Sequence, residues 1–176
     1  PQKEVEQIPV TQEPVVKTYA SSTLGISFDY APEFILNDEY SYTAFAGKPI
    51  YGVSVTVPAS MATGTNLSVD TYVSVEQLPR ANACTGDIFL IANVSSSELT
   101  ENGVEYSVAS SSGAAAGNRY DEIVYALRGS KPCTAVRYFI HSTAIGNYQG
   151  GTVIEFDRTA VLREFDKVRR TLLLSQ

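Results

Sequence analysis

The residues best suited to chemistry are Cys84, Cys133 and His141, which are the two cysteines and the single histidine of this 176-residue chain. A cysteine nucleophile needs its histidine within hydrogen-bond reach. Cys133 precedes His141 by eight residues on one expected strand, and a strand rises about 3.3 Å per residue, so these two side chains are too far apart. Cys84 is therefore the one remaining cysteine that could pair with His141.

Zinc sites in proteins usually take their ligands from paired spacings such as CxxC or HxxxH. The two cysteines and the histidine are dispersed along the chain and show neither spacing. We therefore expect no metal site and no other cofactor.

Serine is abundant, but a serine hydrolase needs an ordered triad rather than many hydroxyls. Asp121 or Asp157 could complete such a triad with His141 on paper, yet the sequence contains no Gly-x-Ser-x-Gly elbow. The glycine-rich segment 110–118 lacks the lysine and the strand-to-helix setting that hold phosphate. We predict that the chain is not an enzyme and has no catalytic or cofactor-binding residues.

Both cysteines lie beside turn-forming segments, residues 79–86 and 129–132. Two cysteines in a chain expected to be exported fit one disulfide, Cys84–Cys133, whose long loop would add roughly 3–5 kcal/mol of stability. The alternative is two free buried thiols that behave as small apolar side chains. We favour the disulfide.

Composition limits the class of protein. A hydrophobic fraction of 44% over 176 residues is enough for one core, so we expect a single domain. Thirteen Lys and Arg against nineteen Asp and Glu give a net charge of −6, which repels phosphate backbones, so nucleic acid is a poor partner. The longest apolar runs, such as residues 88–92, are far shorter than the roughly 20 residues of a membrane-spanning helix.

Residues 1–17 contain three prolines among Gln, Glu and Val, a composition that cannot bury enough apolar area to offset the entropy of ordering. We expect a flexible tether over residues 1–17 and a folded domain over residues 18–176. Since the sequence starts at Pro1 rather than at Met, we expect a processed or truncated product. A lipid anchor upstream of the tether would suit this pattern, and so would a domain linker or a cloning boundary.

Alternating apolar residues predict strands at 24–30 and 51–57, separated by a loop or short irregular strand over 33–49. Residues 66–78 fit both a helix, capped by Asn66 or Ser68, and an alternating strand, and we prefer the helix. Asn102 and Gly103 predict a hairpin between residues 97–100 and 104–108.

Residues 119–127 and 133–142 form a second expected hairpin, joined through 128–132. Alternation within residues 133–142 places Arg137, Phe139 and His141 on the same face. Together the strands predict an antiparallel meander.

The carboxyl end changes its period. From an expected N-cap at Asp157, the apolar residues Val161, Phe165, Val168 and Leu172 recur at helical spacing and form one stripe. The remaining surface carries a basic cluster, which we interpret as a solvated face rather than as a site for an acidic partner. Its members are Arg158, Arg163, Lys167, Arg169 and Arg170.

The sequence combines a polar tether, the run Leu-Gly-Ile-Ser-Phe-Asp-Tyr-Ala-Pro at 24–32, the run Val-Ser-Val-Thr-Val at 53–57, a four-strand meander and a terminal amphipathic helix. In these features it resembles the Mog1/PsbP-like group, in particular its small bacterial lipoproteins. The resemblance implies an α+β fold, a single antiparallel β-sheet flanked by helices. It also implies a non-catalytic envelope or accessory protein that binds other proteins. No binding residue carries over from the group to this sequence.

The expected hairpin tip at 110–118 is the first candidate for partner contact, because rigid sheets present such tips to solvent. The candidate contact residues are Ser112, Gly113, Gly117, Asn118, Arg119 and Tyr120. Tyrosine rings near expected loops could add a binding surface, although core packing explains most of the 11 tyrosines. These loop tyrosines are Tyr40, Tyr42, Tyr51 and Tyr148.

Two functions follow as hypotheses. The first is a non-catalytic, exported binding module, a lipoprotein of the bacterial periplasm or outer membrane, whose partner is another envelope protein and whose membrane contact is confined to an upstream lipid anchor. The alternative is a small-ligand-binding protein or a hydrolase with a cleft near His141 and Tyr148. A deep polar cavity converging on His141 would favour the alternative, and a filled core with a flat sheet face would favour the module. The sequence predicts no particular oligomeric state.

Overall fold

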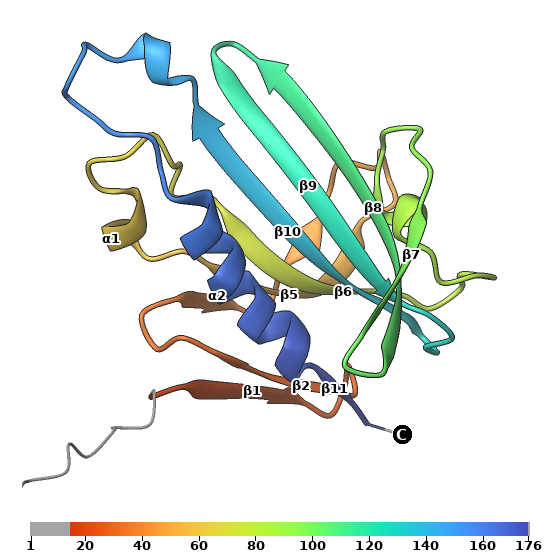
Figure 1. Cartoon of the computed structure of the whole chain (residues 1–176). Helices are drawn as coiled ribbons and strands as arrows, with labels where there is room; N and C mark the ends of the chain where they lie inside the picture. Colours follow the sequence, from red (N-terminus) through yellow and green to blue (C-terminus); the bar gives the residue numbers. More distant parts are fainter. Residues whose placement is uncertain (1–14, 176) are drawn as a thin grey trace, which may run out of the picture.

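The computed structural model describes residues 15–175 (Figure 1). Within this range the strands form two sheets, an eight-stranded sheet in the order β3-β5-β6-β10-β9-β8-β7, with β4 also paired to β5, and a three-stranded sheet in the order β1-β2-β11. Every ladder in both sheets is antiparallel. The predicted α+β class and antiparallel pairing are therefore present. The prediction of a single sheet is wrong, because β2 pairs with β1 and with the last strand instead of joining the meander.

The larger sheet consists of β3 (Ile35–Asn37), β4 (Ser41–Tyr42), β5 (Ile50–Thr56), β6 (Tyr72–Leu78), β7 (Ser97–Glu101), β8 (Val104–Ala115), β9 (Asn118–Leu127) and β10 (Cys133–Thr143). The smaller sheet consists of β1 (Lys17–Ser21), β2 (Ile26–Tyr30) and β11 (Leu173–Leu174). The helices are α1 (Ala59–Ala62) and α2 (Arg158–Thr171), with short 3-10 turns η1 (Gly86–Phe89) and η2 (Ile145–Asn147). The predicted tether over residues 1–17 lies almost wholly outside the described residues and stays a prediction.

The strands predicted from alternation are confirmed as β2 and β5, and the segment between them holds the short strands β3 and β4. Both predicted hairpins are present as β7–β8 and β9–β10. Asn102 and Gly103 turn the first hairpin with φ of 51° and 81°, the left-handed values that a two-residue hairpin turn requires.

The helix predicted over residues 66–78 is wrong, because residues 72–78 form strand β6. This strand lies between β5 and β10, and Val73 and Val75 are 0% and 1% exposed on its apolar side. These residues form a strand rather than a helix because they pair on both edges and bury their alternating valines.

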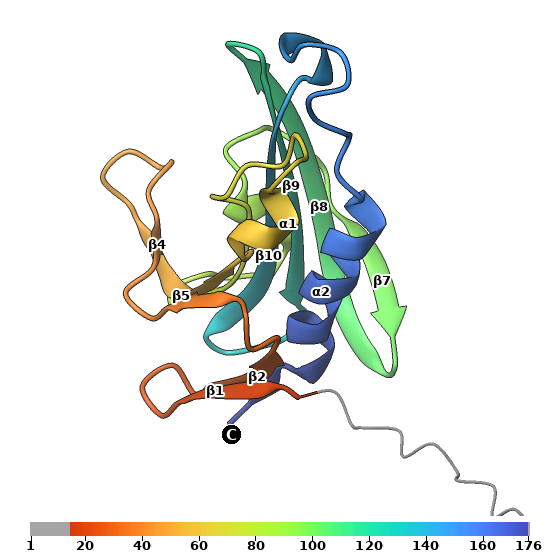
Figure 2. The same ribbon diagram turned by 90° about the vertical axis from the view of Figure 1, so that its left-hand side faces the viewer.

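Helix α2 covers one face of the larger sheet, and the smaller sheet lies against its carboxyl-terminal end (Figures 1 and 2). The Asp157 side chain accepts a hydrogen bond from the Ala160 N–H, as expected of an N-cap. Val161, Phe165 and Val168 are buried against the valines of β5 and β6 and the apolar residues of β10, which confirms these three residues of the predicted stripe. Leu172, the fourth, follows the last helical residue and is only partly buried against the same core. Neither α-helix within residues 15–175 has the length and apolar character of a membrane span.

The predicted basic surface of α2 is only partly solvated. Arg169 is 4% exposed and pairs with Glu101 of β7 at 2.5 Å and with Asp166 at 3.0 Å. Its guanidinium also lies over the rings of Tyr125 and Tyr106. Arg169 therefore fastens the helix to the β7–β8 side of the sheet instead of facing water.

The opposite face of the larger sheet has a second, smaller core. The segment that follows β6 folds over this face and inserts Phe89 and Leu90, which are 0% and 4% exposed. The Cys84–Cys133 disulfide, with an S–S distance of 2.11 Å, ties that segment to the start of β10 and confirms the predicted pairing. Because this second core covers only part of the face, the remainder is left open.

Candidate functional site

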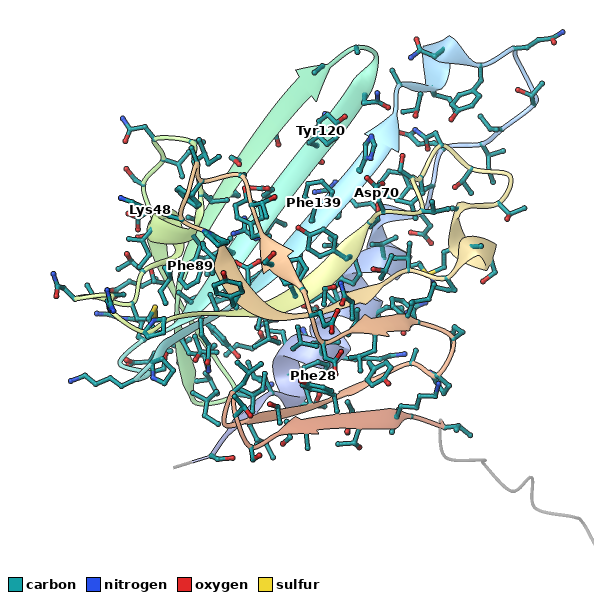
Figure 3. The ribbon with its side chains drawn as sticks, turned by 180° about the vertical axis from the view of Figure 1, so that it is seen from behind. Phe28, Lys48, Asp70, Phe89, Tyr120 and Phe139 are labelled. Atoms are coloured by element: carbon teal, nitrogen blue, oxygen red, sulfur yellow. A yellow bond between two sulfur atoms is a disulfide. The ribbon has the colours of Figure 1, made fainter. Side chains whose placement is uncertain are left out.

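Alternate residues of the central strands β6, β10 and β9 point to the face opposite α2, and they divide it into two parts. We call one part the closed half, defined by Tyr40, Tyr42, Glu76, Glu122 and Arg137. We call the other part the open half, defined by Asp70, Tyr72, Tyr120, Phe139 and His141. Figure 3 views this face, with Tyr120, Phe139 and Asp70 toward one end of the sheet and Phe89 toward the other.

Arg137 is the centre of the closed half, and its side chain is 0% exposed. Its guanidinium donates to both Glu76 oxygens at 2.7 and 2.9 Å, to Glu122 Oε2 at 3.1 Å and to the Phe89 carbonyl at 2.7 Å. The Tyr42 ring lies 3.6 Å from Arg137 Cζ, so the cation also stacks on an aromatic face. Every one of these contacts withdraws the guanidinium from solvent and gives it a partner.

Two phenols complete the closed half. Tyr40 donates to Glu76 Oε1 at 2.8 Å, and Tyr42 donates to Glu122 Oε1 at 3.0 Å. Burial and the charge of Glu76 raise the pKa of Tyr40, and burial raises the pKa of Tyr42 even though Arg137 acts against it. The phenols therefore stay protonated and act as hydrogen-bond donors.

The guanidinium keeps its charge. Burial alone would lower the pKa of Arg137, but its hydrogen bonds to Glu76 and the charges of Glu76 and Glu122 raise it. The Arg137 cation and the protonated phenols of Tyr40 and Tyr42 are therefore paired with the carboxylates of Glu76 and Glu122. The geometry of the closed half is that of a structural ion-pair cluster.

The open half is a row of aromatic rings. Tyr72 stacks on Phe139 with ring centroids 4.9 Å apart, Phe139 lies 6.3 Å from Tyr120, and Tyr120 stacks on His141 at 4.4 Å. All four rings are half-buried, so each keeps part of its surface in water. Tyr40 joins the two halves, because its ring lies 5.3 Å from that of Tyr72. Burial raises the pKa of Tyr72 to about 12, although its hydrogen bond with Tyr40 lowers it.

His141 ends the row and is held by Asp70. His141 Nδ1 lies 2.8 and 2.9 Å from the two Asp70 carboxylate oxygens, and because a carboxylate only accepts, Nδ1 carries the proton. Nε2 is buried and has no hydrogen-bond partner among the described residues. A histidine oriented by a carboxylate is one component of a general-base pair.

The cleft predicted at His141 and Tyr148 stays a prediction. Tyr148 follows η2 and is 37% exposed, and within residues 15–175 no hydrogen bond or ring contact joins it to His141. The pockets described in this part of the chain are lined elsewhere; one of about 930 Å³ lies beside Lys48, Tyr51 and Ile88. No group of three or more His, Cys, Asp or Glu side chains in the described residues is arranged to hold a metal ion.

The predicted contact residues lie on the β8–β9 hairpin, which is regular strand up to a two-residue turn at Ala116 and Gly117. Tyr120 and Gly113 are paired across the two strands on the open face. Ser112 and Arg119 instead face the α2 side, where both bond Asp121. Gly117 lies in the turn, and Asn118 begins β9 on the same face as Tyr120, where its Oδ1 accepts a hydrogen bond from Thr143 Oγ1 at 3.0 Å.

Sequence reasoning placed Arg137, Phe139 and His141 on one face, which the structure confirms. It missed Tyr72 and Glu76, because the helix assigned to 66–78 hid the alternation that directs both toward the same face. Tyr40 and Tyr42, two of the tyrosines that could have added a binding surface, are buried, which agrees with the alternative of core packing.

No protein-family model matches the sequence, and no curated protein matches it. Among solved structures, a crystal structure of a protein from Bacteroides thetaiotaomicron VPI-5482 is similar with a TM-score of 0.50 and 13% identity, over 91% of this chain and 48% of that one. The chain thus spans about half the length of that protein. At this identity the similarity shows a shared fold alone.

A solution structure of cyanobacterial PsbP (CyanoP) from Synechocystis sp. PCC 6803 is also similar, with a TM-score of 0.47 and 14% identity, over 97% of this chain and 98% of that one. This second similarity is too weak to carry an argument. The antiparallel sheet with a covering helix that the Mog1/PsbP-like resemblance implies is present in the fold itself.

Proposed function

We propose that the chain is a non-catalytic, exported binding module whose partner, another envelope protein, docks on the open half of the larger sheet. The observation that carries this proposal is the row of four half-buried rings beside a cluster in which every polar group is paired. Aromatic side chains that are already ordered are the residues that most often anchor protein interfaces.

Strand pairing and ring contacts hold the row in place without a partner. Phe139 and His141 belong to β10, which is paired on both sides, and Tyr120 is fixed between Phe139 and His141 by ring contacts. A partner that binds here orders few additional side chains, and the entropic cost of association is correspondingly small.

Charge indicates the kind of partner. The two halves together contain the carboxylates of Asp70, Glu76 and Glu122 against the single guanidinium of Arg137. The whole chain also carries a net charge of −6. A partner with Lys or Arg side chains would be steered toward this surface and could stack its cations on the ring faces.

A library of random twelve-residue peptides displayed on phage tests the proposal. We expect enrichment of peptides that contain Arg or Lys, and we expect Tyr120→Ala to weaken a synthetic copy of the tightest peptide at least tenfold, about 1.4 kcal/mol. Tyr51→Ala is the matched control, because Tyr51 is a 64% exposed tyrosine outside the open half. Failure to enrich any peptide, or equal losses in both variants, would contradict the proposal.

Export, a lipid anchor and membership of the Mog1/PsbP-like lipoproteins belong to the same proposal. Support comes from the Cys84–Cys133 disulfide, since such bonds persist in oxidising compartments. Fractionation of cells that make the protein, with thiol labelling of the recovered chain, tests this part. We expect the protein in the envelope fraction with both thiols blocked, and recovery from the cytosol with free thiols would contradict it.

The Asp70–His141 pair supports the alternative, a hydrolase, because it orients an imidazole as a general base would be oriented. The buried position of Nε2, without a hydroxyl or thiol partner in the described residues, is unfavourable for that role. Turnover of p-nitrophenyl esters that is abolished by His141→Gln would favour the hydrolase over the binding module.

A further inference from the structure

Strand β8 is longer than its neighbour β7. The β7–β8 ladder ends where Ser97 pairs with Val108, whereas the β8–β9 ladder continues until Ala115 pairs with Asn118. Residues 109–115 of β8 therefore have a paired strand on one side only. The β8–β9 hairpin extends past the end of β7 in Figure 1.

The turns at both ends of β8 determine which backbone groups face this free edge. In a hairpin with a two-residue turn, the two residues that flank the turn form a hydrogen-bonded pair. The backbone N–H and C=O groups of Ala115 therefore bond to β9, and those of Gly113 and Ser111 do the same, because hydrogen-bonded pairs alternate along the ladder. The turn at the other end makes Val104 bond with β7 by the same rule. Whether the residues are counted from one turn or from the other, the N–H and C=O groups of Ser110, Ser112 and Ala114 point away from β9, at positions beyond the end of β7.

Ala109 is buried beside Gly86 of η1, but the rest of the free edge, residues 110–115, has neither charge nor proline. Residues 109–115 read Ala-Ser-Ser-Ser-Gly-Ala-Ala, without lysine, proline or any charged side chain. Ser110, Ser112 and Ala114 are all exposed. Proteins normally blunt such an edge with charge, proline or a bulge, so an unprotected edge is a template for another strand.

We propose that residues 109–115 of β8 bind an extended segment of the partner protein as an added strand, with a basic side chain of that segment lying across Gly113 on the Tyr120 ring. This inference rests on the proposed binding function and specifies how the partner docks. Main-chain hydrogen bonds supply affinity in this mode, and side-chain contacts supply specificity.

The geometry at Gly113 explains the basic side chain. Gly113 pairs with Tyr120 on the open face, and a Cβ built at Gly113 meets no atom within 4 Å. An added strand would lie about 10 Å from β9, two strand spacings away, a distance that an Arg or Lys side chain spans. A second copy of this chain is the poorer occupant, because two chains of net charge −6 repel each other.

Ser112→Pro removes one outward N–H and leaves the bonds between β8 and β9 intact, since proline is tolerated on the free side of an edge strand. The substitution also removes the hydrogen bond of 2.6 Å from Ser112 Oγ to Asp121 Oδ1. Ser112→Ala removes that bond alone and is the matched control. We expect the tightest phage-selected peptide to bind Ser112→Pro at least tenfold more weakly than wild type, and Ser112→Ala within twofold of wild type.

Peptide backbone methylation gives a second readout that does not depend on a variant folding. In an added strand, the N–H groups of every second peptide residue face β8. N-methylation of these residues should abolish binding to the wild-type chain, whereas N-methylation of the residues between them should change the affinity by no more than a few fold. Amide exchange of Ser110, Ser112 and Ala114 in the wild type should slow when the unmethylated peptide is added.

The outcomes separate the two proposals. If no peptide is enriched, the proposed function fails. If a peptide binds through Tyr120 but Ser112→Pro, both methylated sets and the three amides show no effect, the added strand is wrong and the binding function stands. If wild type is a dimer that Ser112→Pro converts to a monomer, a second copy occupies the edge and the proposed occupant is wrong.

Discussion

The closed and open halves of one sheet face are built from the same strands, but the polar groups of the closed half are buried and paired, whereas the rings of the open half are partly exposed. In the closed half, Arg137 is 0% exposed, and each of its three guanidinium nitrogens donates to a carboxylate or a carbonyl. In the open half, Tyr120 and Phe139 contact each other and neighbouring rings but retain exposed surface. The covering segment with Phe89 accounts for the difference, because it extends over one half only.

The comparison shows that unusual residues need not be functional residues. The buried Arg137 cation and the phenols of Tyr40 and Tyr42, whose pKa values are raised, are the strongest electrostatic feature of the face. Their hydrogen bonds are nevertheless made within the fold. The rings of the open half keep part of their surface exposed, and they are the groups left available to a partner. Availability, rather than perturbation, identifies the candidate site.

The largest expected effect comes from breaking the closed half. Arg137→Met should lower the free energy of unfolding by about 3–5 kcal/mol, because it leaves the buried carboxylate of Glu76 and the partly buried carboxylate of Glu122 without their cation. Urea denaturation monitored by circular dichroism measures this. The double variant Arg137→Met, Glu76→Leu should recover part of the loss, and a single variant as stable as wild type would show that the cluster is not structural.

Removing the tie on the covering segment should have the next largest effect. Replacing Cys84 and Cys133 by serine opens a loop with a sequence separation of 49 residues, for which we expect a loss of about 2–4 kcal/mol. Thermal unfolding with and without reductant checks it. Wild type under reducing conditions should match the double variant, and no change in either would contradict the assigned role of the disulfide.

Asp121 stabilises the β8–β9 hairpin from the α2 side of the sheet, where it accepts hydrogen bonds from Ser112 and Arg119 of the hairpin and from Arg158 of α2. Burial alone would raise the pKa of Asp121, but hydrogen bonds from Ser112, Arg158 and Arg119 lower it below its ordinary value. A lowered folded-state pKa adds stability that is present above the unfolded pKa of about 3.9 and lost as pH falls through the folded value. Asp121→Asn should therefore cost about 1–2 kcal/mol at pH 7.

Urea titrations of wild type and Asp121→Asn between pH 2 and 7 test the sign of this effect. The gap in unfolding free energy should be constant above about pH 5 and close as the pH falls below about 3.9. A gap that widens toward acid would contradict the assignment.

The smallest stability effect belongs to the open half. Tyr120→Ala should cost about 1 kcal/mol or less, as expected of a half-exposed side chain. The same substitution in the closed half, Tyr42→Ala, should cost about 3 kcal/mol or more, since Tyr42 is buried against Arg137. Equal losses in the two variants would remove the distinction between the halves.

Local patterns predicted much of this architecture. The spacing of Val161, Phe165 and Val168 indicated α2 and its buried face, and Asn102 with Gly103 indicated a hairpin because few other pairs adopt left-handed turns. These features depend on residues that are close in the sequence. The disulfide was favoured on cysteine count and context, although its geometry depends on the fold.

Features that depend on distant pairing were missed. Strand β11 is two residues long and pairs with Ser27 and Ile26, so nothing near residue 173 signals a separate sheet. Strand β6 carries both a helical and an alternating pattern, and its neighbours β5 and β10 decide between them. The open half was hidden for the same reason, because Tyr72 meets Phe139 only when β6 pairs with β10.

The most direct test of the central claim, that the open half is the binding surface, is a nuclear magnetic resonance titration of the wild-type chain with the tightest selected peptide. The account predicts shift changes at Tyr72, Tyr120, Phe139 and His141 and at the amides of residues 109–115, with Arg137 and helix α2 little affected. Shifts confined to α2 or to the pocket beside Tyr51, with the row of rings unchanged, would contradict it.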